Sequence, residues 1–151
     1  MSRNGIFIVG CGSIGLRHIQ NLRSLGVNRL IGFDPDFTRA TTAINDHEIH
    51  LVNSIEEGFN LSPLATVICA PPNKHIEIAQ MALENNSHLF IEKPISNTLS
   101  GIDQLISQAS AKNLHIMVGY NLRYSESLSN TKAIVTDGVI GRIISIHAEF
   151  G

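Results

Sequence analysis

The chain has 151 residues and a formal net charge of −2 at neutral pH, a size that suits one domain with its own hydrophobic core. Apolar residues make up 43% and charged residues 16% of it, as in ordinary globular proteins. This balance excludes a basic face for nucleic acid and a polybasic membrane patch. No apolar run approaches the roughly 20 residues of a membrane helix, and the first residues leave no room for a signal peptide.

Cysteine usage indicates the compartment. Cys11 and Cys69 are the only two cysteines, and their spacing matches no metal-binding pattern. Two isolated thiols are typical of a reducing environment, where disulfide frameworks are rare. We therefore expect a cytoplasmic protein without a metal site and without nucleic-acid or membrane partners.

Short apolar runs alternate with segments of helical periodicity along the chain. The expected strands are 6–9, 29–33, 49–52, 65–70, 88–91 and 115–118. The expected helices are 13–26, 38–47, 55–59, 74–84, 96–112 and 125–136. Such alternation is typical of a parallel sheet that is covered on both sides. The sequence predicts an α/β fold, a Rossmann-type doubly wound parallel sheet with helices on both faces.

A glycine-rich loop stands between the first expected strand and helix. Gly10, Gly12 and Gly15 follow the G-x-G-x-x-G pattern, in which the glycines allow a tight turn, a close approach to a pyrophosphate and close helix packing. The helix start, with Ser13 and Ile14, presents free N–H groups and the positive end of the helix dipole to the anion. The alternative is a purely structural glycine turn.

Asp34 ends the second expected strand, about 20 residues after the loop, where an acidic residue binds the adenosine ribose. Its charge would repel a 2′-phosphate by about 4 kcal/mol at about 4 Å and a dielectric constant near 20, which favours NAD over NADP. Arg39 would relieve this repulsion by folding back, so NADP is the less favoured cofactor. The alternatives are an Asp-Pro turn and an S-adenosylmethionine methyltransferase site, which shares these features.

The charged residues Glu92 and Lys93 directly follow the buried fifth strand, and Pro94 stiffens the exit. Such a pair is costly after an apolar strand unless it faces a cleft. A lysine beside a nicotinamide orients a substrate hydroxyl and shares in moving its proton. Since methyltransferases do not need this lysine, Lys93 favours an oxidoreductase. The alternative is a surface ion pair at a strand end.

The motifs 10–15, 69–75, 92–94 and 119–124 together resemble those of the Gfo/Idh/MocA oxidoreductases, the relatives of glucose-fructose oxidoreductase and inositol dehydrogenase. The resemblance covers essentially the whole chain in the family's order and spacing. It implies an NAD-dependent transfer of hydride between nicotinamide and a hydroxyl-bearing carbon of a sugar or cyclitol. It also implies further cofactor-contacting residues: Ala70, Pro71, Asn73, His75, Glu92, Lys93, Asn121 and Arg123.

Within that set, the resemblance implies a catalytic role for Lys93 and a contact of Glu92 with the nicotinamide ribose. His75 would lie near the nicotinamide end with Asn73. A histidine in the first turn of a helix also serves as a cap or a packing residue, and this alternative stays open for His75.

Residues 1–124 are predicted to form the NAD(P)-binding Rossmann domain. Residues 125–151 are predicted to be a connecting helix and, over 142–150, the first strand of a C-terminal substrate domain that this chain lacks. The resemblance implies that this second domain supplies the substrate pocket, the dimer interface and a histidine. We therefore expect the chain alone to be inactive and to form homo-oligomers, with strand 142–150 as a contact. The alternative is a stand-alone dinucleotide-binding or sensing module.

Overall fold

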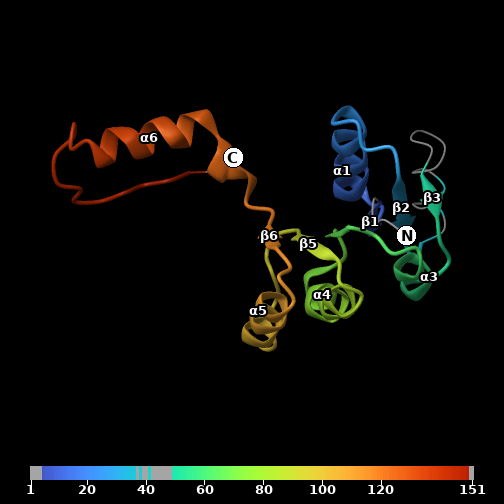
Figure 1. The fold of residues 1–151 in the computed structure, drawn as a ribbon. Helices are drawn as coiled ribbons and strands as arrows, with labels where there is room; N and C mark the ends of the chain where they lie inside the picture. Colours follow the sequence, from blue (N-terminus) through green and yellow to red (C-terminus); the bar gives the residue numbers. More distant parts are fainter. Residues whose placement is uncertain (1–4, 37, 39–40, 42–48, 150–151) are drawn as a thin grey trace. The chain divides into compact units, whose positions relative to one another are not determined.

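The structure, a computed structural model, describes residues 5–36, 38, 41 and 49–149 (Figure 1). The chain divides into two units, Met1–Gly119 and Tyr120–Gly151. This boundary lies a few residues before residue 124, where the sequence predicts the end of the cofactor-binding domain. All strands found in the described residues belong to the first unit.

A parallel sheet forms the centre of the first unit. Its strands stand in the order β3-β2-β1-β4-β5-β6, and every neighbouring pair is parallel. The chain moves from β1 outward to β3 and then returns to the other side of β1, so the strand order reverses between β1 and β4. The strands are β1 (Ile6–Val9), β2 (Leu30–Phe33), β3 (His50–Leu51), β4 (Ala65–Ile68), β5 (His88–Ile91) and β6 (Ile116–Val118).

The strand register aligns the carboxyl ends of the central strands at one edge of the sheet. Val9 of β1 pairs with Phe33 of β2 on one side and with Ile68 of β4 on the other, and Ile68 pairs with Ile91 of β5. The glycine loop and the segments after β2, β4 and β5 therefore start at the same edge of the sheet. In folds of this kind, ligands bind at that edge, where the strand order reverses.

Helices cover both faces of the sheet, as the sequence predicts. Because side chains alternate along a strand, Ile8 packs with Ile19 of the first helix, whereas Phe7 points to the opposite core, where it meets Phe59 edge-to-face at 5.3 Å. Figure 1 shows α1 on one side of the strands and α4 and α5 on the other. The helices are α1 (Ser13–Ser24), α3 (Ile55–Asn60), α4 (His75–Glu84) and α5 (Ile102–Ala111), and a short 3-10 turn, η1 (Pro72–Lys74), precedes α4.

The helix predicted over 96–112 is shorter than expected, because α5 begins only at Ile102. Gly101 has a φ of +83°, which a right-handed helix does not accept, and a Cβ at this position would lie 2.9 Å from Cγ2 of Ile76. Leu99, an apolar residue within the predicted helix, is 88% exposed. The polar residues before Gly101 form turns instead of a first helical turn.

Two expectations concern the region after β2. The helix predicted over 38–47 lies mostly outside the described residues, and so does Arg39. The third strand is shorter than the predicted 49–52, since it pairs with β2 only over His50–Leu51. No helix in the described parts of the chain is both long and apolar enough to cross a membrane.

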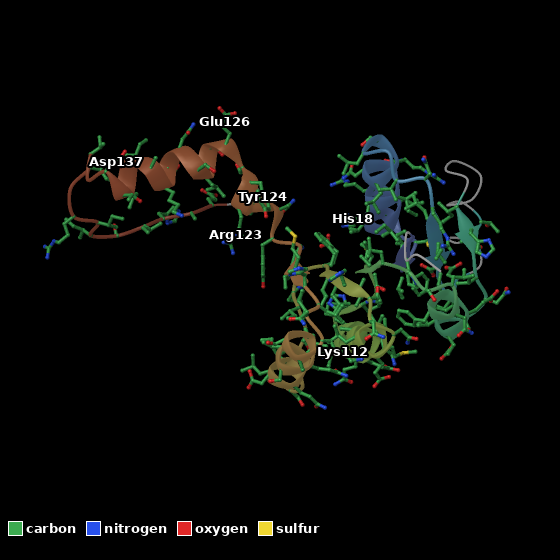
Figure 2. All side chains as sticks on the ribbon, in the orientation of Figure 1. His18, Lys112, Arg123, Tyr124, Glu126 and Asp137 are labelled. Atoms are coloured by element: carbon green, nitrogen blue, oxygen red, sulfur yellow. The ribbon has the colours of Figure 1, made fainter. Side chains whose placement is uncertain are left out.

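The second unit contains a 3-10 turn, η2 (Asn121–Tyr124), and the helix α6 (Glu126–Thr136). Figure 2 labels Glu126 and Asp137 at the two ends of α6, and Gly138 follows with a φ of +71°. The strand predicted over 142–150 is not formed in its described part, 142–149. The alternating pattern is present, but a strand also needs a neighbour for its backbone hydrogen bonds, and none pairs with it among the described residues.

Candidate functional site

The three glycines of the loop have different surroundings. Gly10 has a φ of +99°, and a Cβ there would lie 2.7 Å from the carbonyl carbon of Cys69. A Cβ on Gly15 would overlap the carbonyl oxygen of Gly10, whereas a Cβ on Gly12 would meet no atom within 4 Å. Gly10 and Gly15 therefore allow the turn and the packing of α1, while Gly12 faces open space that a ligand can approach.

The start of α1 is suited to an anion. Gly12 is the N-cap residue, no side chain caps the helix, and its first turn contains no acidic residue. The first N–H groups of a helix have no partner within the helix, and they carry the positive end of its dipole. A phosphate or pyrophosphate satisfies both at once.

Asp34 is tied directly to the glycine loop. The residue follows β2 and is 9% exposed. Its Oδ2 accepts the backbone N–H of Cys11 at 2.8 Å, and its Oδ1 accepts the N–H of Asp36 at 2.8 Å. Each carboxylate oxygen offers two lone pairs, so both keep one for a further donor. The acid predicted to bind a ribose is thus fixed beside the loop predicted to bind a pyrophosphate.

A cavity of about 520 Å³ opens at this place. Its size falls within the roughly 300–1,000 Å³ that is typical of small-molecule sites. Asp34 and the glycine loop form its polar side, and most of the remaining wall is apolar. It is lined by Val9, Gly10, Gly12, Phe33, Asp34, Pro35, Ile55, Cys69, Ala70, Pro71, Lys74, Glu77 and Ile78.

A smaller cavity of about 180 Å³ lies at the ends of β4 and β5. It shares Cys69 and Ala70 with the larger cavity, so the two adjoin at the turn after β4. It brings together residues that the sequence predicts around the nicotinamide. It is lined by Ile14, Cys69, Ala70, Pro72, His75, Glu92 and Lys93.

His75 begins α4 and is only 1% exposed. Its Nε2 lies 2.7 Å from the carbonyl oxygen of Ala70, and its Nδ1 lies 2.9 Å from that of Pro94. Both ring nitrogens are therefore engaged with backbone carbonyls. The residue borders the smaller cavity, and its polar atoms join the segments after β4 and β5.

Glu92 has a partner that the sequence analysis missed. His18 of α1, labelled in Figure 2, places its Nε2 2.8 Å from Oε1 of Glu92 and packs edge-to-face on Phe90, with ring centroids 5.0 Å apart. The two side chains are 22% and 19% exposed. The signal was present in the sequence, because His18 follows Gly15 by one helical turn and so lies on the side of α1 that faces the sheet.

The remaining predicted site residues differ in exposure and in the unit to which they belong. Lys93 is exposed where it borders the smaller cavity, and Ser13 and Asn73 are exposed at the starts of α1 and η1. Asn121 and Arg123 belong to η2 of the second unit.

The two thiols are held in their neutral form. Burial raises the pKa of Cys11 to about 12, and the nearby charge of Asp34 adds to this effect. Burial likewise raises the pKa of Cys69 to about 12, with a contribution from Glu92. Because the thiolate is the reactive and metal-binding form, neither residue is prepared for nucleophilic chemistry. The described residues contain no cluster of metal-ligating side chains.

Comparison with known proteins identifies the class. The chain belongs to the Gfo/Idh/MocA oxidoreductase family with an NAD-binding Rossmann fold, whose model matches residues 5–120. This confirms the family resemblance of the four motifs and the oxidoreductase class.

Individual relatives carry related names. An inositol 2-dehydrogenase of Salmonella typhimurium is 29% identical over 147 residues, which are 93% of this chain and 44% of that protein. An uncharacterized oxidoreductase of Bacillus subtilis, YrbE, is 28% identical over 137 residues, 89% of this chain and 40% of that protein. The crystal structure of a myo-inositol 2-dehydrogenase from Lactobacillus plantarum matches with a TM-score of 0.86 and 25% identity over 95% of this chain and 44% of that one. The chain thus spans about two fifths of the length of these relatives.

Proposed function

We propose that this chain is the cofactor-binding part of an NAD-dependent dehydrogenase that acts on a hydroxyl-bearing carbon of a sugar or cyclitol. The observation that carries the proposal is the bond between Asp34 and the N–H of Cys11 at the edge of the 520 Å³ cavity. This bond fixes a ribose acceptor next to the open start of α1. The names of the inositol dehydrogenase relatives support a polyol substrate.

The adenosine half of the site comprises the glycine loop, Asp34 and the larger cavity. In the proposal, the N–H groups at the start of α1, including those of Ser13 and Ile14, hold the pyrophosphate. The free lone pairs of Asp34 accept the ribose hydroxyls. A 2′-phosphate would instead meet a like charge, at a cost of about 4 kcal/mol at about 4 Å and a dielectric constant near 20. This supports NAD over NADP.

The nicotinamide half comprises Ala70, His75, Glu92 and Lys93 around the smaller cavity. NAD, when bound, supplies the carbon that exchanges hydride with the substrate. Lys93 orients the substrate hydroxyl and shares in moving its proton. Its exposed position at the border of the smaller cavity supports this role. Glu92 accepts from the nicotinamide ribose while His18 holds its Oε1.

The remaining assignments follow from the family resemblance. Pro71 passes along the cofactor, and Asn73, Asn121 and Arg123 contact the cofactor or line the substrate cleft. A second domain completes the substrate pocket, so the chain alone is expected to bind NAD without turning over a polyol. Residues 142–150 are proposed as the contact through which a homo-oligomer forms.

The test is a calorimetric titration of the unmodified chain with NADH, NADPH and S-adenosylmethionine at one fixed salt concentration. We expect NADH to bind at least about tenfold more tightly than NADPH, and S-adenosylmethionine not to bind. Equal dissociation constants for the two dinucleotides would contradict the role of Asp34 in the ribose contact. A chain that binds only S-adenosylmethionine would contradict the dehydrogenase assignment.

A further inference from the structure

His75 contacts two hydrogen-bond acceptors through its ring nitrogens, whereas a neutral histidine has only one ring N–H donor. A neutral imidazole carries one N–H donor and one bare nitrogen that accepts. Both ring nitrogens of His75 face carbonyl oxygens, Ala70 at 2.7 Å and Pro94 at 2.9 Å, and a carbonyl oxygen only accepts. With a single proton on the ring, one of these two short contacts would set two lone pairs against each other.

We propose that His75 is a positioning residue that carries a proton on both ring nitrogens and donates to both carbonyls. The imidazolium then holds the turn after β4 and the segment after β5 at a fixed separation. For its consequence in catalysis, this inference rests on the dehydrogenase function proposed above. The protonation state itself stands on the two contacts and on the burial of the ring.

The charged and titratable groups near the ring come from three elements. On its own helix, Lys74 and Glu77 pair with each other at 2.9 Å and are more than half exposed. After β4, the pKa of the Cys69 thiol is raised to about 12, so this group is neutral. After β5, Glu92 and Lys93 border the same 180 Å³ cavity.

Glu92 is therefore the acidic group that shares this cavity with the ring. A buried charge is expensive unless it is hydrogen-bonded and compensated. The two carbonyl oxygens accept from both N–H groups, and of the two charged residues that border the cavity, Glu92 favours the cation and the exposed Lys93 opposes it. Hydrogen bonds from a charged donor are roughly twice as strong as neutral ones.

The two carbonyls belong to segments that carry the proposed chemistry. Ala70 borders both cavities, and Pro94 directly follows Lys93. The two hydrogen bonds of His75 fix the distance between these backbone segments. They thereby fix the position of the Lys93 backbone relative to the turn after β4 that borders the proposed nicotinamide site. His75 thus acts through its neighbours, because both of its ring nitrogens contact backbone carbonyls.

The direct test is nitrogen NMR of the chain with 15N-labelled histidine at about pH 8, where an ordinary exposed histidine is neutral. We expect His75 to show two protonated ring nitrogens with slowly exchanging protons, and its signals to vanish in His75→Gln. His50, exposed on β3, serves as the control residue. A single protonated nitrogen on His75, or none, would overturn the proposal.

A second measurement tests positioning through NADH affinity. The glutamine of His75→Gln carries both of its N–H donors on one nitrogen and cannot reproduce donation from two separate ring nitrogens. We therefore expect binding to weaken on the order of tenfold, whereas His50→Gln binds as the parent chain does. Circular dichroism establishes that both variants fold. A folded His75→Gln variant with parental affinity would overturn the positioning role. If the parent chain binds no NADH, the proposed function fails, while the NMR result still decides the protonation of His75.

Discussion

The adenosine half of the proposed site is formed by glycine backbone, apolar side chains and the buried carboxylate of Asp34, in a cavity of about 520 Å³ whose wall also includes the exposed pair Lys74 and Glu77. The nicotinamide half is smaller, about 180 Å³, and places Glu92, Lys93 and His75 in its wall. In the first half, the backbone leaves space for the ligand and Asp34 discriminates between ligands by its charge. In the second, Glu92 and His75 are each held by a long-range contact, with His18 and with the Pro94 carbonyl, whereas Lys93 is exposed.

The largest effect that we expect is on the rate at which the two cysteine thiols react. Cys69 borders both cavities, and the pKa of both Cys69 and Cys11 is raised to about 12. A raised pKa keeps the thiol protonated up to a higher pH, so the reactive thiolate is scarcer at about pH 8 than in an ordinary cysteine of pKa about 8.5. We expect dithionitrobenzoate to label the folded chain on the order of 1,000-fold more slowly than the urea-unfolded chain.

The variants Cys11→Ala and Cys69→Ala assign the two labelling phases. Fast labelling of Cys69 in the folded chain would contradict the raised pKa of this thiol. Fast labelling of Cys11 would contradict its full burial beneath the glycine loop.

Two glycine substitutions in the adenosine half distinguish a glycine needed for packing, Gly15, from one that leaves room for the ligand, Gly12. A Cβ in Gly15→Ala overlaps the carbonyl oxygen of Gly10, so we expect a loss of about 2–3 kcal/mol in the free energy of unfolding. Gly12→Ala meets no atom within 4 Å, so its stability should change by less than about 0.5 kcal/mol. Urea unfolding measures both.

The same two variants behave differently with ligand. We expect the stable Gly12→Ala chain to lose NADH affinity, because its methyl group occupies the path of the pyrophosphate. Unchanged affinity of this variant would place the pyrophosphate elsewhere on the chain.

A smaller effect is expected from the charge of Asp34. In Asp34→Asn, one amide oxygen still accepts an N–H but the repulsion of a 2′-phosphate is lost, so the preference for NADH over NADPH should shrink on the order of tenfold. Asp36→Asn makes the same chemical change two residues away and should leave the preference intact. Parallel titrations measure both ratios, and equal effects of the two variants would mean that general charge, and not the ribose contact, sets the preference.

The adenosine half was predictable because its determinants are local. Gly10, Gly12 and Gly15 fall within one strand-loop-helix segment, and Asp34 stands at the end of the next strand. The supports of the nicotinamide half were not predictable in this way, since His18 and Glu92 are 74 residues apart and meet only when α1 packs over β5. Their pairing requires the sheet register, which sequence periodicity does not provide.

Two errors in the predicted elements have the same origin. The polar residues after 96 match a helix start, but Gly101 adopts a φ of +83° against Ile76, a neighbour from another helix. Residues 142–149 alternate as a strand does, yet strand formation depends on a partner strand. Both predicted elements were wrong, because a local pattern expresses only a preference. At Gly101 a tertiary contact decided the structure, and residues 142–149 have no partner strand among the described residues.

The smallest expected effect tests whether the two halves are energetically independent. His18→Leu removes the donor to Glu92, a loss of about 1 kcal/mol, so we expect NADH binding to weaken about fivefold. NADH and NADPH are identical at the nicotinamide end, so the preference between them should stay at the parental value. In a Glu92→Gln background, His18→Leu should add little further loss, because the pair acts as one unit. A changed NADH preference, or fully additive losses, would mean that His18 acts through α1 on the pyrophosphate instead of through Glu92.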